Sequence, residues 1–391
     1  MAPARPPRPI AIACGGTGGH LFPGLAVADQ LRARGCPVTL LISPKEVDQH
    51  AVRNATGVSV VTLPAVGWTG GRLIAFLRGF RASYRASRRL FQHQRPAAVL
   101  AMGGFTSAPP VLAGRRAGAE TFLHESNAIP GRANRWLSWI IGQAFVGFAE
   151  AAPRLHTRNV TVSGTPVRPQ FCPRNPGECR AALGLDPRQP VALVMGGSQG
   201  ARGVNDLVLA ALPLVAGGAP DLQWFHLTGP NDFAQVRDHY AALGLPGRVH
   251  PFFDQMELAL GAATVAVSRA GASSLAELAA LRVPAVLVPY PAAADDHQLH
   301  NARAFERTGA ALLLQQGSAT PESLARAILD LLHNDELRAR MSAALAPWHA
   351  PRAAEQIAQA LLRTLAASEP VAKQKPGSHA ATAPRHLSAP T

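Results

Sequence analysis

The chain has 391 residues, of which 47% are hydrophobic and 16% charged, so it has enough apolar material for large cores and is not globally disordered. At this length two ordinary domains are more typical than one. The formal net charge of +14 is unevenly placed, because residues 1–165 contain 19 Lys and Arg against 6 Asp and Glu. A basic first half indicates an anionic partner, which charge alone leaves open as nucleic acid, phosphorylated substrate or membrane.

Short apolar runs alternate with segments of helical spacing over the first 150 residues. This βαβα order predicts a parallel sheet covered by helices. The expected strands are 10–14, 38–42, 98–101, 121–123 and 145–148, with a helix over 25–31. The apolar stretch 136–148 is too short and too interrupted to span a membrane, and we expect a core helix that runs into the last of these strands.

Residues 68–91 combine aromatic and aliphatic side chains with six arginines. This pattern is typical of a basic amphipathic helix on an anionic membrane, and equally of a helix whose apolar face packs on the core. Because no RNA-binding motif accompanies it, we expect no nucleic-acid partner.

The strand–loop–helix pattern starts again near residue 190. Further strands are expected over 191–195, 222–227, 265–267 and 285–289. The chain is therefore predicted to be an α/β protein with an N-terminal domain, a C-terminal domain, a closing helix and a tail without periodicity. The expected bounds are 1–165, 166–345, 346–366 and 367–391.

A glycine-rich loop, CGGTGGH at 14–20, follows the first strand. Its glycines let the backbone approach a ligand, and the following helix N-terminus favours anions. The loop lacks the Lys-Ser/Thr pair of a P-loop and the spacing of GxGxxG. His20 lies where the crevice of an α/β sheet binds ligands and is a candidate general base, although a tight turn with an incidental histidine explains the pattern as well.

Two loops in the second half stand in the same relation to a strand. The GGSQGAR loop at 196–202 contains Ser198, whose hydroxyl can hold a phosphate together with backbone amides. Residues 268–277 lead into a helix whose first turns carry Glu277. A carboxylate there can bind the two hydroxyls of a ribose, or it can simply belong to a solvated helix end.

Polar residues also follow other strands, at 103–107, 124–127 and 295–301. Such residues point at the crevice or merely end the strand, and 295–301 is well placed to bind sugar hydroxyls. His297 and His300 lack the carboxylates that would complete a coordination shell, so we expect no metal.

These motifs together resemble the MurG family of glycosyltransferases. Each motif alone is weak, but their joint order and spacing across residues 9–365 are specific. The motifs are GGTGGH at 15–20, FPGLAVA at 22–28, GGF at 103–105, HESN at 124–127, GGSQGAR at 196–202 and RAGA at 269–272 running to Glu277. The resemblance implies the GT-B architecture, in which two Rossmann-like domains face a deep cleft.

The resemblance also implies an activity. Members of the family transfer N-acetylglucosamine with inversion from UDP-N-acetylglucosamine to the 4-hydroxyl of the muramyl sugar of lipid I, an undecaprenyl-pyrophosphate-linked precursor, and form lipid II for peptidoglycan synthesis. The implied location is peripheral, on the anionic cytoplasmic face of the inner membrane. No cofactor and no metal are implied.

The site residues are carried over position by position. His20 is implied as the base that takes the acceptor proton, and the donor is bound mainly by the C-terminal domain. The implied donor-binding residues are Thr17, Gly18, Gly19, Asn127, Arg168, Ser198, Phe253, Ala272, Ser273, Ser274, Leu275, Ala276, Glu277 and Gln298.

Individual roles follow from the same resemblance. Arg168 and Ser198 would neutralise the diphosphate, and Phe253 would support the uracil through its backbone. Glu277 would bind the ribose, and Gln298 would bind the N-acetylglucosamine hydroxyls.

The sequence departs from the family pattern in a few places. Asn is usual where Thr165 stands, Gln is common where Ser126 and His297 stand, and 291–294 looks one residue longer than usual. Rival classes are another GT-B UDP-sugar transferase, a UDP-N-acetylglucosamine epimerase, a membrane-bound scaffold and an inactive UDP-binding relative. A dehydrogenase would need GxGxxG with an acidic residue about twenty positions later, which is absent.

Overall fold

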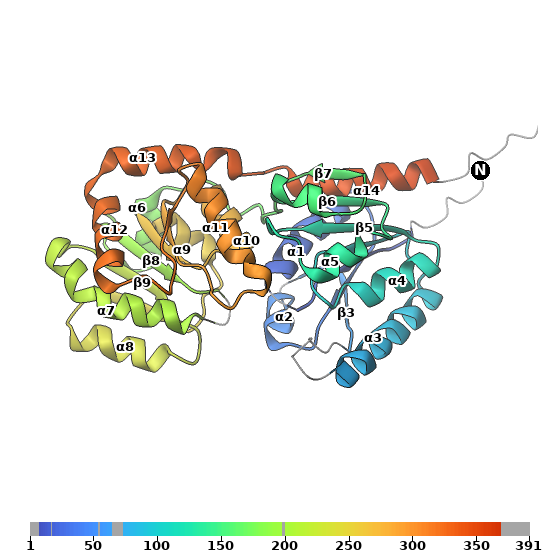
Figure 1. Cartoon of the computed structure of the whole chain (residues 1–391), viewed down its shortest axis with the longest axis horizontal. Helices are drawn as coiled ribbons and strands as arrows, with labels where there is room; N and C mark the ends of the chain where they lie inside the picture. Colours follow the sequence, from blue (N-terminus) through green and yellow to red (C-terminus); the bar gives the residue numbers. More distant parts are fainter. Residues whose placement is uncertain (1–7, 17, 54, 65–72, 198–199, 369–391) are drawn as a thin grey trace, which may run out of the picture.

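A computed structural model describes residues 8–368 apart from 17, 54, 65–72 and 198–199. Two α/β lobes lie side by side, one built from each half of the chain (Figure 1). The segment 163–175 leads from the first lobe into the second.

The N-terminal lobe contains a parallel sheet of seven strands in the order β3-β2-β1-β4-β5-β6-β7. The strand β1 lies at its centre, where Ile10 is in register with Val38 on one side and Ala98 on the other. The strands are β1 (Ile10–Ala13), β2 (Val38–Ile42), β3 (Ser59–Thr62), β4 (Ala98–Ala101), β5 (Glu120–Glu125), β6 (Gln143–Val146) and β7 (Val160–Val162).

Both faces of this sheet are buried, which is why its central strands are continuous apolar runs. Ile10 and Ile12 belong to the core on one face, and Ala11 and Ala13 to the core on the other. The helical segments of this lobe are α1 (Gly18–Arg32), α2 (Glu46–Ala51), α3 (Leu73–His93), α4 (Ala108–Arg116), α5 (Arg132–Leu137) and the 3-10 turn η1 (Ala149–Arg154).

The C-terminal lobe repeats the plan with six parallel strands in the order β10-β9-β8-β11-β12-β13. Both sheets thus have the Rossmann strand order. The chain adds strands on one side of the first strand and then crosses over to add the rest on its other side. The strands are β8 (Val191–Met195), β9 (Gln223–Leu227), β10 (Gly247–His250), β11 (Val265–Ser268), β12 (Ala285–Leu287) and β13 (Leu312–Leu313).

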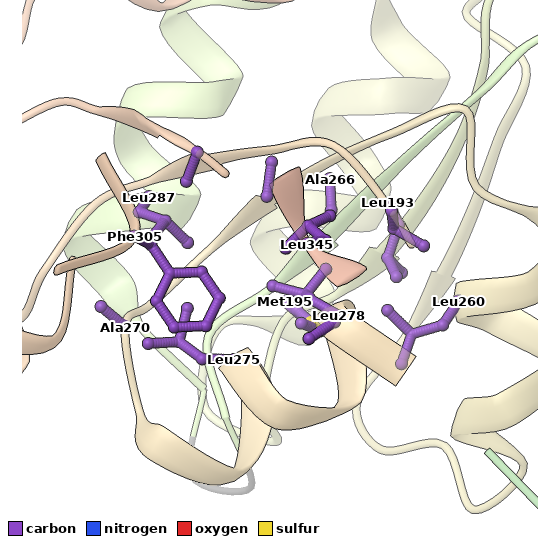
Figure 2. Close-up of a cluster of buried hydrophobic side chains, with 14 of the residues drawn as sticks. Leu193, Met195, Leu260, Ala266, Ala270, Leu275, Leu278, Leu287, Phe305 and Leu345 are labelled. Carbon is purple, nitrogen blue, oxygen red and sulfur yellow. The ribbon is translucent and has the colours of Figure 1, made fainter. Parts of the chain in front are cut away.

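Helices also enclose the second sheet. Figure 2 shows one of its cores, where side chains of the central strands, among them Leu193 and Leu287, meet Leu275 and Leu278 of α10 and Phe305 of α11. The helical segments are α6 (Pro176–Ala182), α7 (Arg202–Gly218), α8 (Phe233–Ala242), α9 (Met256–Ala262), α10 (Ala272–Leu281), η2 (Ala294–Asp296), α11 (His297–Arg307), α12 (Pro321–His333), α13 (Asp335–Ala344) and η3 (Ala346–Trp348).

The last helix, α14 (Ala353–Ser368), returns to the first lobe. Ile357 and Leu361 join the core formed by β1, β2 and α1. The single helix expected over 346–366 is therefore replaced by the short turn η3 and by α14, which are separated at Pro351, a residue that cannot continue a helix. The tail predicted over 367–391 lies outside the described residues beyond 368.

The predicted α/β class with two parallel sheets is confirmed. Two local predictions are wrong: the strand expected over 145–148 spans 143–146, and the helix expected from 136 toward this strand ends at Leu137. The basic segment is helical from Leu73 to His93, whereas its first residues lie outside the described part. Within the described residues, no helix is both long and apolar enough to cross a bilayer.

Candidate active site

The glycine-rich loops lie at the carboxyl ends of the central strands. In the first lobe, the loops after β1 and β4 meet where the strand order reverses, and in the second lobe the loops after β8 and β11 do the same. Open α/β sheets bind ligands at this position. A cavity of about 1790 Å³ lies here and is lined by residues of both lobes.

Most of the predicted site residues line this cavity. They are Gly18, Gly19, His20, Asn127, Arg168, Phe253, Ala272, Ser273, Ser274, Glu277 and Gln298. Leu275 and Ala276 instead have buried side chains, so any contact they make to a ligand would involve their backbone. Thr17 and Ser198 lie outside the described residues.

His20 lies in the first turn of α1, against the turn formed by Gly103 and Gly104. These two glycines have φ angles of 112° and 76°, which other residues rarely adopt. A Cβ atom on Gly103 would lie 2.8 Å from Cδ2 of His20, so the close approach also requires glycine. Burial lowers the pKa of His20 to about 4, and the imidazole is therefore neutral near pH 7.

A second buried histidine lies nearby. Nε2 of His124 is 3.0 Å from the carbonyl oxygen of Gly164, and its Nδ1 is 3.2 Å from the hydroxyl of Ser126. Burial lowers its pKa to about 4. Because both ring nitrogens are engaged within the first lobe, His124 has a structural role in holding the end of β5.

Glu125 organises the loop that carries Asn127. One carboxylate oxygen accepts hydrogen bonds from the backbone N–H and the side-chain amide of Asn127, at 2.8 and 3.0 Å. The other accepts from the N–H of Gly131 and from Asn134, both at 2.9 Å. The amide of Asn127 is thereby oriented toward the second lobe.

Asn301 of α11 connects that loop to the second lobe. Its side-chain amide donates to Oδ1 of Asn127 at 3.0 Å and to the carbonyl of Ala270 at 3.1 Å, while its oxygen accepts from the N–H of Ala128 at 2.8 Å. Asn301 is fully buried, and these bonds hold the two lobes in register beside the cleft.

Arg168 supplies a cation at the junction of the lobes. Its guanidinium carbon lies 4.7 Å from the ring centroid of Phe22 and 5.1 Å from that of Phe171. Its buried Nε has no hydrogen-bond partner in the described structure. A stacked guanidinium with unused donors in a cleft is suited to binding a phosphate.

Glu277 lies in the second turn of α10 and lines the same cleft. Burial raises its pKa to about 7. The charge of Arg168 lowers the pKa, and that of Glu257 raises it. A perturbed carboxyl group in a cleft is a candidate for ligand binding. Phe253, also in the wall, packs edge-on against Phe225 of β9, with ring centroids 5.1 Å apart.

Gln298 and its neighbours form a rim that contacts the opposite lobe. The side-chain oxygen of Gln298 accepts a hydrogen bond from the N–H of Tyr290 at 3.0 Å, so its amide group remains to meet a ligand. Asp295, three residues earlier, pairs with Arg132 and Arg135 of α5 at 3.1 and 2.8 Å.

The sequence alone did not single out Asp48, and it indicated Asp295 and Asn301 only as part of the polar segment 295–301, not as contacts between the lobes. Their partners are distant in sequence, as for Asn301 and Asn127, which are 174 residues apart, and no local motif indicates such contacts. Among the described residues, no group of three or more His, Cys, Asp or Glu side chains is arranged to hold a metal ion.

Two Rossmann-type lobes that face a shared cleft form the GT-B architecture. The sequence profile of the glycosyltransferase family 28 N-terminal domain matches residues 10–146, and that of the family 28 C-terminal domain matches residues 191–359. The chain belongs to glycosyltransferase family 28 and is a hexosyltransferase.

Named relatives are similar over most of the chain. A protein of Sorangium cellulosum named UDP-N-acetylglucosamine–N-acetylmuramyl-(pentapeptide) pyrophosphoryl-undecaprenol N-acetylglucosamine transferase is 39% identical over 362 residues, covering 90% of this chain and 87% of the relative. The crystal structure of MurG from Acinetobacter baumannii matches with a TM-score of 0.71 at 28% identity, covering 92% of this chain and 100% of that one.

An epimerase shares the architecture. The UDP-GlcNAc 2-epimerase of Neisseria meningitidis, solved with bound UDP-GlcNAc, matches with a TM-score of 0.66 at 13% identity, covering 90% of this chain and 100% of that chain. At this identity the likeness concerns the fold alone. Family membership excludes the dehydrogenase alternative.

Proposed function

We propose that this glycosyltransferase moves N-acetylglucosamine from UDP-N-acetylglucosamine to the muramyl 4-hydroxyl of undecaprenyl-pyrophosphate-linked lipid I, which gives lipid II. One observation supports this most: the neutral imidazole of His20, from the N-terminal lobe, lines the same cleft as Arg168 and Glu277. The named relatives, up to 40% identical over most of the chain, act on these substrates according to their names.

The donor would lie along the C-terminal wall. Glu277 binds the ribose hydroxyls, the backbone near Phe253 supports the uracil, and the amide of Gln298 binds a hydroxyl of the sugar. The N-terminus of α10, near Ser273 and Ser274, faces the cleft and favours the diphosphate, together with Arg168.

Chemistry then takes place between the two walls. The muramyl hydroxyl attacks the anomeric carbon from the face opposite the UDP, His20 accepts the hydroxyl proton, and the bond from carbon to the UDP oxygen breaks. A neutral imidazole is the form that can accept a proton. The negative charge that develops on UDP is stabilised by Arg168 and the helix N-terminus.

The acceptor is attached to a membrane, and helix α3 is suited to meet one. Leu73, Ile74 and Leu77 are 52%, 75% and 49% exposed, which is unusual for aliphatic side chains. Phe76, from the same helix, and Trp136 of α5 line the cleft. Exposed arginines follow along the helix, at 78, 81, 85, 88 and 89.

This arrangement supports peripheral docking on the cytoplasmic face of an anionic inner membrane. The apolar end of α3 would enter the interface while its arginines contact acidic headgroups. The part of the cleft lined by Phe76 and Trp136 would then lie near the membrane surface, where the muramyl sugar of lipid I is presented.

Transfer of radiolabelled N-acetylglucosamine to a short-chain lipid I analogue tests this function, with UDP-glucose as the control donor. We expect selective transfer from UDP-N-acetylglucosamine. Absence of transfer despite UDP binding would contradict the proposed reaction, and formation of the 2-epimer of the donor would identify an epimerase instead.

A further inference from the structure

A buried carboxylate lies beneath the first glycine loop. Asp48 of α2 is fully buried, and its Oδ2 accepts three hydrogen bonds: from the N–H of Gly16 at 2.7 Å, the N–H of Ser43 at 3.1 Å and the hydroxyl of Ser43 at 2.5 Å. Its other oxygen, Oδ1, has no partner among the described residues. Burying a charged group with an unpaired oxygen is costly, so Asp48 is not explained by packing alone.

The carboxylate is part of a clamp on the glycine loop. While Asp48 holds the N–H of Gly16, the ammonium group of Lys45 donates to the carbonyl of the same residue at 2.9 Å. The hydroxyl of Thr106 donates to the carbonyl of Gly15 at 2.5 Å. A Cβ atom on Gly15 would lie 2.3 Å from the backbone nitrogen of Ser43, so the loop is also fixed by close packing on the end of β2.

The clamped loop leads directly into the helix that carries His20. Helix α1 begins at Gly18, two residues after Gly16, and His20 lies in its first turn. Because the N–H and the carbonyl of Gly16 are both hydrogen-bonded, the imidazole of His20 is restricted in where it can lie in the cleft.

Asp48 also acts on His20 through its charge. Burial is the largest influence and lowers the pKa of His20, the Asp48 carboxylate opposes it, and Lys45 and His297 lower the pKa further. The pKa of His124 is in turn lowered by burial and by His20. Asp48 is the only one of these groups whose charge favours a protonated His20.

We propose that Asp48 is a positioning residue for the transfer reaction, because it fixes the loop that leads into the helix carrying His20 and supplies a buried negative charge that acts on the ring. The inference rests on the proposed function, in which His20 takes the proton of the acceptor hydroxyl. When that proton arrives, the imidazolium forms in a poorly solvated site, and a fixed negative charge stabilises it. Asp48 does not line the cleft, so it acts through His20 and the loop.

The substitution Asp48→Asn removes the charge while keeping the size and one acceptor oxygen. We expect kcat to fall about tenfold or more, with the donor KM within about twofold of the wild-type value, because most of the proposed donor contacts lie on the other wall. Asp29→Asn is the matched control, since it removes an exposed carboxylate from α1 of the same lobe. An unchanged kcat in Asp48→Asn would overturn the proposal.

A second measurement separates positioning from a general loss of structure. The ring nitrogens of His20 can be titrated by NMR with ¹⁵N-labelled histidine, assigned by comparison with His20→Gln, over the pH range in which circular dichroism reports a folded chain. We expect the titration midpoint to move down, by on the order of one pH unit, in Asp48→Asn, and to move up in Lys45→Met. Equal midpoints in the three proteins would contradict the electrostatic role.

Using both variants keeps the proposal testable if one of them misfolds. Lys45 is exposed, so Lys45→Met can be measured even where Asp48→Asn does not fold, and a midpoint that fails to rise counts against the proposal. Where the titration midpoint of His20 lies below the pH at which the chain unfolds, the kinetic test decides: kcat of Asp48→Asn should fall while the donor KM stays near the wild-type value.

Failure of the proposed function gives a different result. In that case the wild-type protein does not glycosylate the lipid I analogue, whereas the effect of Asp48 on the His20 titration is measured without any turnover. Normal wild-type transfer together with an unaltered Asp48→Asn protein would refute this inference alone.

Discussion

The guanidinium of Arg168 stacks on the ring of Phe22, with 4.7 Å between the guanidinium carbon and the ring centroid. Phe22 belongs to α1 of the first lobe, whereas Arg168 lies in the segment that leads into the second. A cation proposed to neutralise the leaving diphosphate is thus held in place by both lobes.

We expect Arg168→Lys to lower kcat by about 10²-fold, because an ammonium group keeps the charge but loses the planar stack and the paired donors. Steady-state kinetics with a lipid I analogue measures this. Arg174→Lys is the control, since Arg174 is exposed and lies on the same segment. An Arg168→Lys enzyme as active as the control would remove the stacked guanidinium from the mechanism.

Glu277 predicts a pH dependence of donor binding. Burial raises its pKa to about 7, so the carboxyl group is largely protonated at pH 6 and largely ionised at pH 8. The carboxylate is the stronger acceptor for ribose hydroxyls, so the affinity for UDP-N-acetylglucosamine should rise about tenfold between these values. Calorimetry at both pH values checks this, and Glu277→Gln should abolish the difference. The same slope in the variant would assign the titration to another group.

Because His226 is buried in its neutral form, we expect the protein to lose stability in acid. Burial lowers its pKa to about 3, and its ring nitrogens lie 3.0 Å from Oδ1 of Asn205 and 3.3 Å from the hydroxyl of Tyr240. The unfolded chain binds a proton at this residue below its ordinary pKa of 6.5, but the folded chain does not, so stability falls as pH decreases from 6.5 toward 3.

Between pH 6.5 and pH 5 this difference amounts to about 2 kcal/mol in the free energy of unfolding. Urea denaturation at the two pH values should show a smaller loss for His226→Gln, which stays neutral and keeps hydrogen-bonding capacity. His20 and His124 titrate in the same direction, so part of the loss should remain. Equal losses in the two proteins would show that His226 is not buried in its neutral form.

The exposed end of α3 predicts membrane binding. The side chain of Ile74 is 75% exposed, so Ile74→Glu should not disturb folding. We expect it to weaken binding to vesicles of phosphatidylglycerol and phosphatidylethanolamine on the order of tenfold, because an apolar side chain that enters the interface is replaced by a charge.

Leu214→Glu serves as the control for that measurement, since Leu214 is 44% exposed on the other lobe. Cosedimentation with the vesicles gives both affinities. Equal weakening by the two substitutions would place the docking surface elsewhere.

The central strands of both sheets could be predicted from the sequence because they are continuous apolar runs buried on two faces. The edge strands could not. β3 and β7 are largely exposed and β10 is mostly half-buried, and polar residues such as Ser59 and Arg248 leave only short hydrophobic runs in them. Their pairing depends on the neighbouring strand, which local patterns do not reveal.

The site was only partly predictable for a related reason. The glycine loops and His20 stand directly after strands, so their place at the crevice follows from topology. The clamp between Asp48 and Gly16 joins residues 32 positions apart, and the bond between Asn301 and Asn127 joins the two lobes. Such contacts arise from the packing of separate elements and have no sequence motif.

We assign the base to the N-terminal wall of the cleft and the donor contacts mainly to the C-terminal wall, and a comparison of His20→Ala with Glu277→Ala tests this assignment. For each protein, kcat for transfer to a lipid I analogue and the Kd for UDP-N-acetylglucosamine are measured side by side. We predict that His20→Ala loses turnover by about 10²-fold or more while its donor Kd stays near the wild-type value, and that Glu277→Ala has a weakened donor Kd. Wild-type turnover in His20→Ala, or an unaltered donor Kd in Glu277→Ala, would contradict it.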